Sequence, residues 1–241
     1  MPEDGASPYH DGAMKLSIVV PVFNEETTVA QVIERVRALE LPVDKEIIVV
    51  NDGSSDGTSA ALRPFRDLPD VRVHESVVNL GKGASVRIGF KLATGDLVGI
   101  QDADLELDPS EYQRLLVPLL DGSADVVFGS RFLGGGQKGA LPFYLANRAL
   151  SGLTNVLYGS RLTDIETCYK VFRREVLQSL TLRAARFEIE PEVTAQVLKR
   201  HFRVVELPIG YNPRSRAQGK KISWRDGFSA VYTLIDQRLK R

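Results

Sequence analysis

Four apolar residues are followed, after one glutamine, by two carboxylates in the stretch Leu97-Val98-Gly99-Ile100-Gln101-Asp102-Ala103-Asp104. A short strand that is apolar throughout is typical of a parallel sheet with both faces covered. Two carboxylates separated by one residue at a strand end can converge on one hard cation, and Mg²⁺ or Mn²⁺ prefers such oxygen ligands. The stretch therefore predicts a buried strand followed by a metal-binding pair, with Glu106 as the third candidate ligand.

An acidic turn that only caps the next helix is the alternative interpretation. However, Asp108 followed by Pro109 already has the form of a helix N-cap with proline in the first turn. Capping by Asp108 leaves Asp102 and Asp104 unexplained, and this favours the metal site.

The rest of the chain continues the alternation of apolar strands and amphipathic helices. In the first half, strands are predicted at 16–22, 46–50, 71–77, 97–100 and 125–129, and helices at 29–39, 58–65, 84–93 and 109–120. The second half is less regular, with strands predicted at 167–173 and 203–207 and helices at 145–157, 191–200 and 224–239. This order predicts an α/β fold in one domain, with a Rossmann-like, mostly parallel central sheet and helices on both faces.

Polar loops follow the first four predicted strands, at residues 21–25, 51–57, 79–83 and 102–104. In open parallel sheets, ligands bind beyond the carboxyl ends of the strands. Chance placement of Gly and Asp in turns explains one such loop more easily than four. We therefore expect these loops to line one ligand-binding crevice.

Composition places the chain among ordinary globular proteins, with 43% hydrophobic and 26% charged residues among 241. Cys168 is the one cysteine, so no intramolecular disulfide forms, and a reducing cytoplasm is expected.

The 31 basic and 31 acidic residues balance, but residues 211–241 contain eight basic and two acidic ones. This basic region has no nucleic-acid-binding motif, and no apolar run is long enough to span a membrane.

The predicted organisation is a disordered tail at 1–13, a domain at 14–223 and an amphipathic basic helix at 224–241. That helix is interpreted either as lying in a membrane interface or as docked on the sheet.

Six motifs in order resemble glycosyltransferase family 2, and within it the dolichyl- or polyprenyl-phosphate mannosyltransferase and glucosyltransferase branch. They are the acidic pair and the segments at 19–25, 50–58, 79–84, 128–132 and 163–170, so the resemblance covers roughly residues 16–226. It implies a GT-A fold, an Mg²⁺ or Mn²⁺ cofactor and a nucleoside-diphosphate sugar donor.

The resemblance also implies roles for individual residues. The donor's base and ribose would contact Pro21, Phe23, Glu25 and Asp52, where Phe23 replaces the tyrosine more usual in the family. Further substrate-binding candidates are Lys82, Ala103, Arg131, Arg214, Arg216 and Lys220, the last three in a basic loop that could close over a phosphate. The catalytic candidates are Asp104, Arg131 and Asp164. For Lys82 a solvated position, and for Glu25 a simple helix-dipole role, stay as alternatives.

The implied reaction moves mannose or glucose, with inversion, from GDP-mannose or UDP-glucose to a polyprenyl or dolichyl phosphate. The expected place is the cytoplasm, at the inner face of a membrane. Two alternatives stay open: transfer to a soluble or polysaccharide hydroxyl, for which Asp164 would be the base, and a catalytically silent nucleotide-sugar-binding protein.

Overall fold

The computed structural model describes residues 14–134, 140–214 and 224–240. Within these ranges one seven-stranded sheet has the order β3-β2-β1-β4-β6-β5-β7. Its strands are β1 (Lys15–Val22), β2 (Asp44–Asn51), β3 (Val71–Glu75), β4 (Leu97–Ile100), β5 (Val126–Ser130), β6 (Lys170–Arg173) and β7 (Val204–Pro208). The predicted tail at 1–13 lies outside the described residues, as do Arg216 and Lys220.

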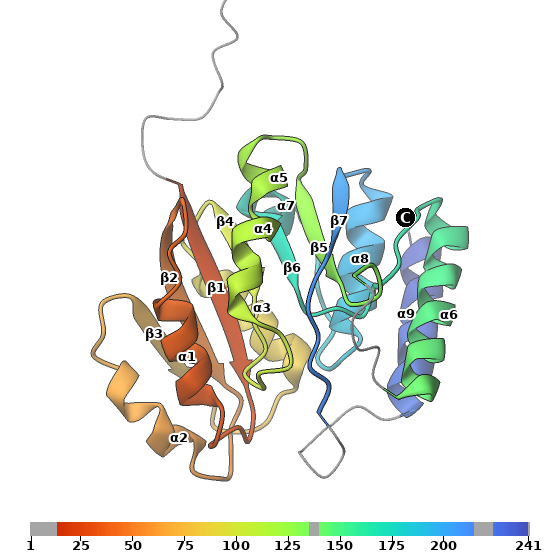
Figure 1. The fold of residues 1–241 in the computed structure, drawn as a ribbon. Helices are drawn as coiled ribbons and strands as arrows, with labels where there is room; N and C mark the ends of the chain where they lie inside the picture. The colour runs from red at the N-terminus through yellow and green to blue at the C-terminus, as the bar shows by residue number, and fades with distance from the viewer. Residues whose placement is uncertain (1–13, 135–139, 215–223, 241) are drawn as a thin grey trace, which may run out of the picture.

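Helices cover both faces of this sheet, with α1 and α4 in front and α3 behind in the view of Figure 1. They are α1 (Val29–Arg37), α2 (Thr58–Ala61), α3 (Lys82–Leu92), α4 (Tyr112–Leu115), α5 (Val117–Leu120), α6 (Leu141–Tyr158), α7 (Arg174–Ser179), α8 (Ile189–Lys199) and α9 (Trp224–Leu239), with 3₁₀ turns η1 (Arg63–Phe65) and η2 (Pro109–Glu111). The predicted α/β fold with a mostly parallel sheet is confirmed. No helix in the described ranges is both long and apolar enough to cross a bilayer.

One strand, β6, runs antiparallel to both of its neighbours, β4 and β5, whereas the other strand pairs are parallel. The amino end of an antiparallel strand lies at the sheet edge where its parallel neighbours have their carboxyl ends. Residues 163–169, which precede β6, therefore reach the same edge as the loops that follow β1, β2, β4 and β5.

Several predicted boundaries were wrong, and proline explains most of the differences. The helix predicted at 58–65 ends at Ala61 and continues as η1 around Pro64, while the one at 109–120 divides at Pro118. Proline lacks the N–H that an uninterrupted helix needs. Conversely, α6 begins at Leu141 instead of 145, because Pro142 lies in its first turn, where the N–H is not required.

The predicted bounds of two strands, β6 and β3, also differ from those observed. The strand predicted at 167–173 begins only at Lys170, because the carbonyls of Ile165 and Thr167 accept hydrogen bonds from the buried Lys170 ammonium. The predicted third strand ends at Glu75, and Val77 is 98% exposed beyond it. The helix α7 was not predicted.

Close packing of α3 on β1 leads to a first prediction. A Cβ atom at Gly89 would lie 2.1 Å from Val19 Cγ1, so Gly89→Ala should lower the free energy of unfolding by about 1–3 kcal/mol. Gly152, also inside a helix, has nothing within 4 Å of such a Cβ atom. Gly152→Ala should therefore stabilise the protein by about 0.5–1 kcal/mol. Urea unfolding of both variants measures the contrast, and equal effects would contradict this packing.

Candidate active site

A cavity of about 340 Å³ lies at the carboxyl edge of the parallel strands. Most of the predicted site residues line it, namely Pro21, Phe23, Glu25, Asp52, Lys82, Asp102, Ala103, Asp104, Glu106, Arg131 and Arg214. They come from segments as far apart in the sequence as Pro21 and Arg214, so folding brings them together. Asp164 does not line the cavity.

The acidic turn, residues 102–106, begins at the end of β4 and directs its carboxylates into the cavity. Leu105 has a φ of +60°, a left-handed conformation that a branched side chain rarely adopts. This turn is closed by a 3.1 Å hydrogen bond from the Glu106 N–H to Asp104 Oδ1. Strained backbone of this kind is often found at functional sites. Here it accompanies the placement of Asp102, Asp104 and Glu106 along one wall of the cavity.

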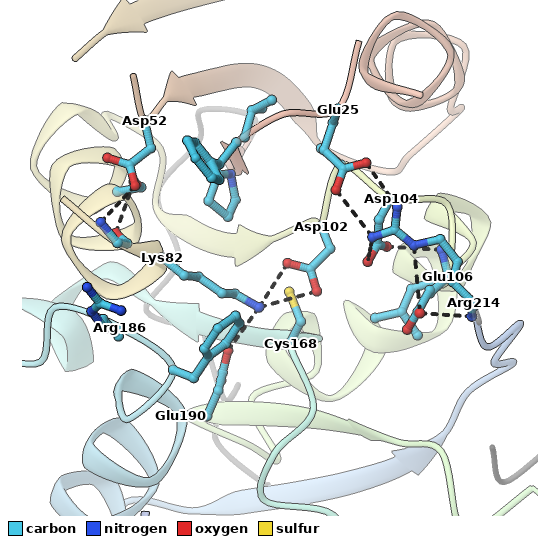
Figure 2. A pocket seen from close by; sticks show the side chains of 18 of the residues that line it. Glu25, Asp52, Lys82, Asp102, Asp104, Glu106, Cys168, Arg186, Glu190 and Arg214 are labelled. Carbon is cyan, nitrogen blue, oxygen red and sulfur yellow. Dashed lines mark hydrogen bonds and ion pairs between the residues drawn. The ribbon is translucent and has the colours of Figure 1, made fainter. Parts of the chain in front are cut away.

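Arg214 bridges carboxylates from two different loops (Figure 2). Its guanidinium lies 3.0 Å from Glu25 Oε2 and 2.8 Å from Asp104 Oδ2, and its backbone N–H donates to Glu106 Oε1 at 2.9 Å. Glu25 is only 9% exposed, so it is more than a first-turn acid that favours the helix dipole. The C-terminal part of the chain is thereby attached to the acidic turn.

Lys82 is paired on the opposite side of the acidic turn and is not a solvated lysine. Its ammonium lies 2.9 Å from Asp102 Oδ1 and 3.5 Å from Glu190 Oε1 (Figure 2). Burial lowers the pKa of Lys82, but Asp102, Cys168 and Glu190 together outweigh burial and hold the pKa well above its usual range. By contrast, burial and then repulsion from Asp102 raise the pKa of Asp104 to about 6.

Asp52 accepts hydrogen bonds from the backbone of the loop before α3, a role that was not predicted. Its two oxygens accept hydrogen bonds from the N–H groups of Leu80 and Gly81, at 2.8 and 2.7 Å. Gly81 has a φ of +96°, and a Cβ atom there would lie 2.4 Å from the Ala185 carbonyl oxygen. Asp52 thus holds the loop that begins α3 close to residues 184–186, which places Lys82 at the cavity. The remaining lone pairs of Asp52 stay available for a nucleotide base.

Arg131 and Asp164 form a bidentate ion pair beside the cavity. Arg131 Nε and Nη2 donate to the Asp164 oxygens at 2.7 and 2.8 Å. Asp164 is 0% exposed, and its own N–H is bound by Glu206. The Asp164 carboxylate is thus buried and paired with Arg131 and does not open onto the cavity, and its catalytic role stays a prediction. The arginine itself lines the cavity, and within the described residues Nη1 donates no hydrogen bond.

The sequence of this chain is similar to those of known proteins. The sequence profile of glycosyl transferase family 2 matches residues 17–181, more than half of the chain. The chain belongs to glycosyl transferase family 2. Two similar proteins are a dolichol-phosphate mannosyltransferase of Pyrococcus furiosus, 29% identical over 86% of this chain, and a dodecaprenyl-phosphate galacturonate synthase of Rhizobium johnstonii, 29% identical over 86%. The alignments span 59% and 62% of those relatives' own lengths.

A solved structure has the same fold. It is the glucosyl-3-phosphoglycerate synthase of Mycobacterium tuberculosis in complex with Mn²⁺, uridine diphosphate and phosphoglyceric acid. The TM-score is 0.73 at 21% identity, with 95% of this chain and 80% of that chain covered. The predicted GT-A fold is thereby confirmed.

The donor set of the acidic turn fits a divalent cation that also binds a substrate diphosphate. In the described part of the chain, no group of three or more His, Cys, Asp or Glu side chains is arranged to hold a metal ion. Mg²⁺ is commonly held by one or two carboxylates together with substrate phosphates, so the Asp102 and Asp104 oxygens suffice. Burial, followed by repulsion from Asp102, raises the pKa of Asp104, and a cation bound beside the two carboxylates would favour their ionised forms.

Several cavity residues were missed as site candidates, among them Glu166, Cys168 and Glu190. Glu190 lies in the first turn of α8. Glu188, which precedes this helix, accepts hydrogen bonds from the Ala185 and Arg186 N–H groups. Glu190 instead enters the cavity wall, together with Glu166 and Cys168. The one available signal was the proximity of Glu166 and Cys168 to Asp164 in a family motif.

The buried ion pair predicts a large stability effect. Asp164→Asn leaves the Arg131 charge uncompensated, so the free energy of unfolding should fall by about 3 kcal/mol or more. The matched control is Asp70→Asn, which breaks an exposed pair with Arg37 and should cost less than about 1 kcal/mol. Urea unfolding distinguishes the two. Similar small losses would show that the Asp164 carboxylate is not needed to compensate Arg131.

Proposed function

We propose that this family 2 protein transfers a hexose from a nucleoside-diphosphate sugar to a polyprenyl phosphate of the dolichyl type, with inversion. The observation that carries the proposal is the presence of Arg131 and the Asp102/Asp104 pair on one cavity. The acidic pair suits a cation and the donor's diphosphate, while Arg131 suits a second, separate phosphate. The relatives named for dolichol phosphate and dodecaprenyl phosphate support this assignment.

On the donor side, Asp102 and Asp104 would hold Mg²⁺ or Mn²⁺, which supplies charge neutralisation to the departing diphosphate. In support, Mn²⁺ accompanies uridine diphosphate in the glucosyl-3-phosphoglycerate synthase of the same fold. Lys82 and Arg214 now neutralise the two carboxylates, and both cations can move to diphosphate oxygens when the donor binds. Asp52, beyond Lys82, would accept a hydrogen bond from the base, either guanine of GDP-mannose or uracil of UDP-glucose.

On the acceptor side, a phosphate monoester is already anionic near neutral pH and attacks without a general base. A hydroxyl acceptor needs a base, and Asp164 is poorly suited because both of its oxygens bind Arg131. This difference favours the lipid phosphate over a soluble or polysaccharide hydroxyl. The in-line attack would leave Arg131 beside the acceptor phosphate, oriented by Asp164.

We also propose that the protein acts at the inner, cytoplasmic face of a membrane. Phe228, Tyr232 and Leu239 recur along α9 at helical spacing and are 71%, 70% and 77% exposed. The basic residues Arg238 and Lys240 lie at the end of the same helix. Such a surface supports peripheral binding near a lipid acceptor.

The acceptor assignment is tested with labelled GDP-mannose and UDP-glucose, Mn²⁺ and vesicles containing a polyprenyl phosphate. We expect label from one donor to enter the organic phase, and Arg131→Lys to reduce this transfer by at least about tenfold, because lysine cannot pair bidentately. If label instead appears only on soluble hydroxyl acceptors, the lipid proposal is wrong. Donor binding with no transfer to any acceptor would favour a catalytically silent protein.

Metal dependence is tested separately. Chelation should abolish transfer and added Mn²⁺ or Mg²⁺ should restore it, because the diphosphate leaves with its charge neutralised. Asp104→Asn should lower kcat/KM by at least about 100-fold, or about 2.7 kcal/mol. Asp108→Asn is the control, since Asp108 caps η2 outside the cavity and asparagine caps equally well. Undiminished transfer by Asp104→Asn would remove the proposed metal role.

A further inference from the structure

Two carboxylate oxygens in the cavity wall accept no hydrogen bond from any described residue. They are Glu166 Oε1 and Glu190 Oε1, and both atoms are buried. Both residues line the cavity that also contains the acidic turn. A buried acceptor without a donor is unfavourable unless a ligand supplies the missing hydrogen bond.

The Glu190 carboxylate is held in a fixed position. Glu190 is 4% exposed, and its Oε2 forms a short hydrogen bond with the ammonium of Lys170, which is 0% exposed. The same ammonium binds the carbonyls of Ile165 and Thr167, the residues on either side of Glu166. Lys170 therefore connects the start of α8 to the segment that contains Glu166. The two oxygens that accept no hydrogen bond therefore belong to one connected structure, in which Glu190 Oε1 also has an ion-pair contact with Lys82.

The position of this pair relates it to the donor. Glu190 Oε1 lies 3.5 Å from Lys82 Nζ, and the same nitrogen lies 2.9 Å from Asp102 Oδ1. The proposed diphosphate site is thus one side chain away from Glu190. A sugar attached to the diphosphate would be expected beside Lys82, next to the two glutamates.

The charged side chains around Glu166 favour binding of a neutral ligand group over an anionic one. Glu190 and Asp164 are its anionic neighbours, and Lys170 and Arg131 its cationic ones, but each cation is already paired with one of those carboxylates. Burial, followed by repulsion from Glu190, raises the pKa of Glu166 to about 7. Sugar hydroxyls can donate hydrogen bonds to the Glu166 carboxyl group without adding charge to this part of the cavity.

We propose that Glu166 and Glu190 form the sugar subsite of the donor, and that Glu166 selects a neutral hexose against a uronate. The inference rests on the proposed function and adds the class of sugar to it. Sugar hydroxyls provide the donors that the two oxygens lack. A sugar carboxylate at Glu166 would provide no donor and would add negative charge beside a carboxyl group in a partly desolvated cavity. The relatives named for mannose and for galacturonate show that family 2 membership does not decide the sugar.

The test compares donors that differ only in a carboxylate at C6. Calorimetric titration with Mn²⁺ measures the dissociation constants of UDP-glucose against UDP-glucuronate, and of GDP-mannose against GDP-mannuronate. For the nucleotide that the wild-type protein binds, we expect the neutral sugar to bind at least about tenfold more tightly than the uronate. Glu166→Gln should reduce the ratio of the uronate dissociation constant to the neutral-sugar dissociation constant several-fold. It does so by strengthening uronate binding, because the amide can donate to a carboxylate without repelling it.

Two controls separate this effect from a general change in charge or folding. Glu175→Gln makes the same chemical change on the exposed surface of α7 and should leave the ratio unaltered. Binding of UDP or GDP without a sugar should be the same for wild type and Glu166→Gln, because the nucleotide contacts lie elsewhere. An unchanged ratio in Glu166→Gln, with nucleotide binding intact, would overturn the sugar subsite alone. Failure of the wild-type protein to bind any nucleotide sugar would overturn the proposed function and the subsite together.

Discussion

Charge compensation at the carboxyl edge of the sheet is the constraint on which the site depends. Buried carboxylates are unfavourable unless a cation or N–H donors accompany them. At this edge Lys82 compensates Asp102, Arg214 compensates Asp104 and Glu25, and Arg131 compensates Asp164. Each pair joins segments that are remote in sequence. Arg214, for example, lies 110 positions from Asp104. The pairs hold the loops around one cavity, and they also keep cations where a diphosphate would need them.

The reversed strand β6 determines which part of the second half reaches this edge. Parallel strands bring only their carboxyl ends to the ligand side, so β1, β2, β4 and β5 contribute the loops that follow them. Because β6 is antiparallel, it contributes the segment that precedes it, residues 163–169. Lys170, the first residue of β6, then fixes this segment to the start of α8 through its buried ammonium. One change of strand direction thus places Glu166 and Cys168 opposite the acidic turn.

Local patterns predicted much of this architecture because their signals are short-range. The bounds of β4 were predicted correctly as 97–100, since an apolar run that stops at Gln101 has few alternatives. The Asp108 cap was also predicted, and its carboxylate accepts the Ser110 N–H. Helix divisions at Pro64 and Pro118 were missed although the residues are visible, because the surrounding periodicity continues through them. The pairing of Lys82 was left undecided, since a lysine in a glycine-rich turn is compatible with solvent or with a buried partner.

The sequence by itself determined most of the strand-and-helix order, with α7 as an exception, the family, and the acidic pair from which the interpretation began. These depend on neighbouring residues, whose spacing follows directly from backbone geometry. Only the tertiary structure decided which charge compensates which. It placed Asp164 behind Arg131 instead of in the cavity, assigned Asp52 to the Leu80–Gly81 backbone, and left one oxygen each of Glu166 and Glu190 without a hydrogen bond. Such assignments depend on distances between segments far apart in the chain and on how deeply each group is buried, and spacing along the sequence determines neither.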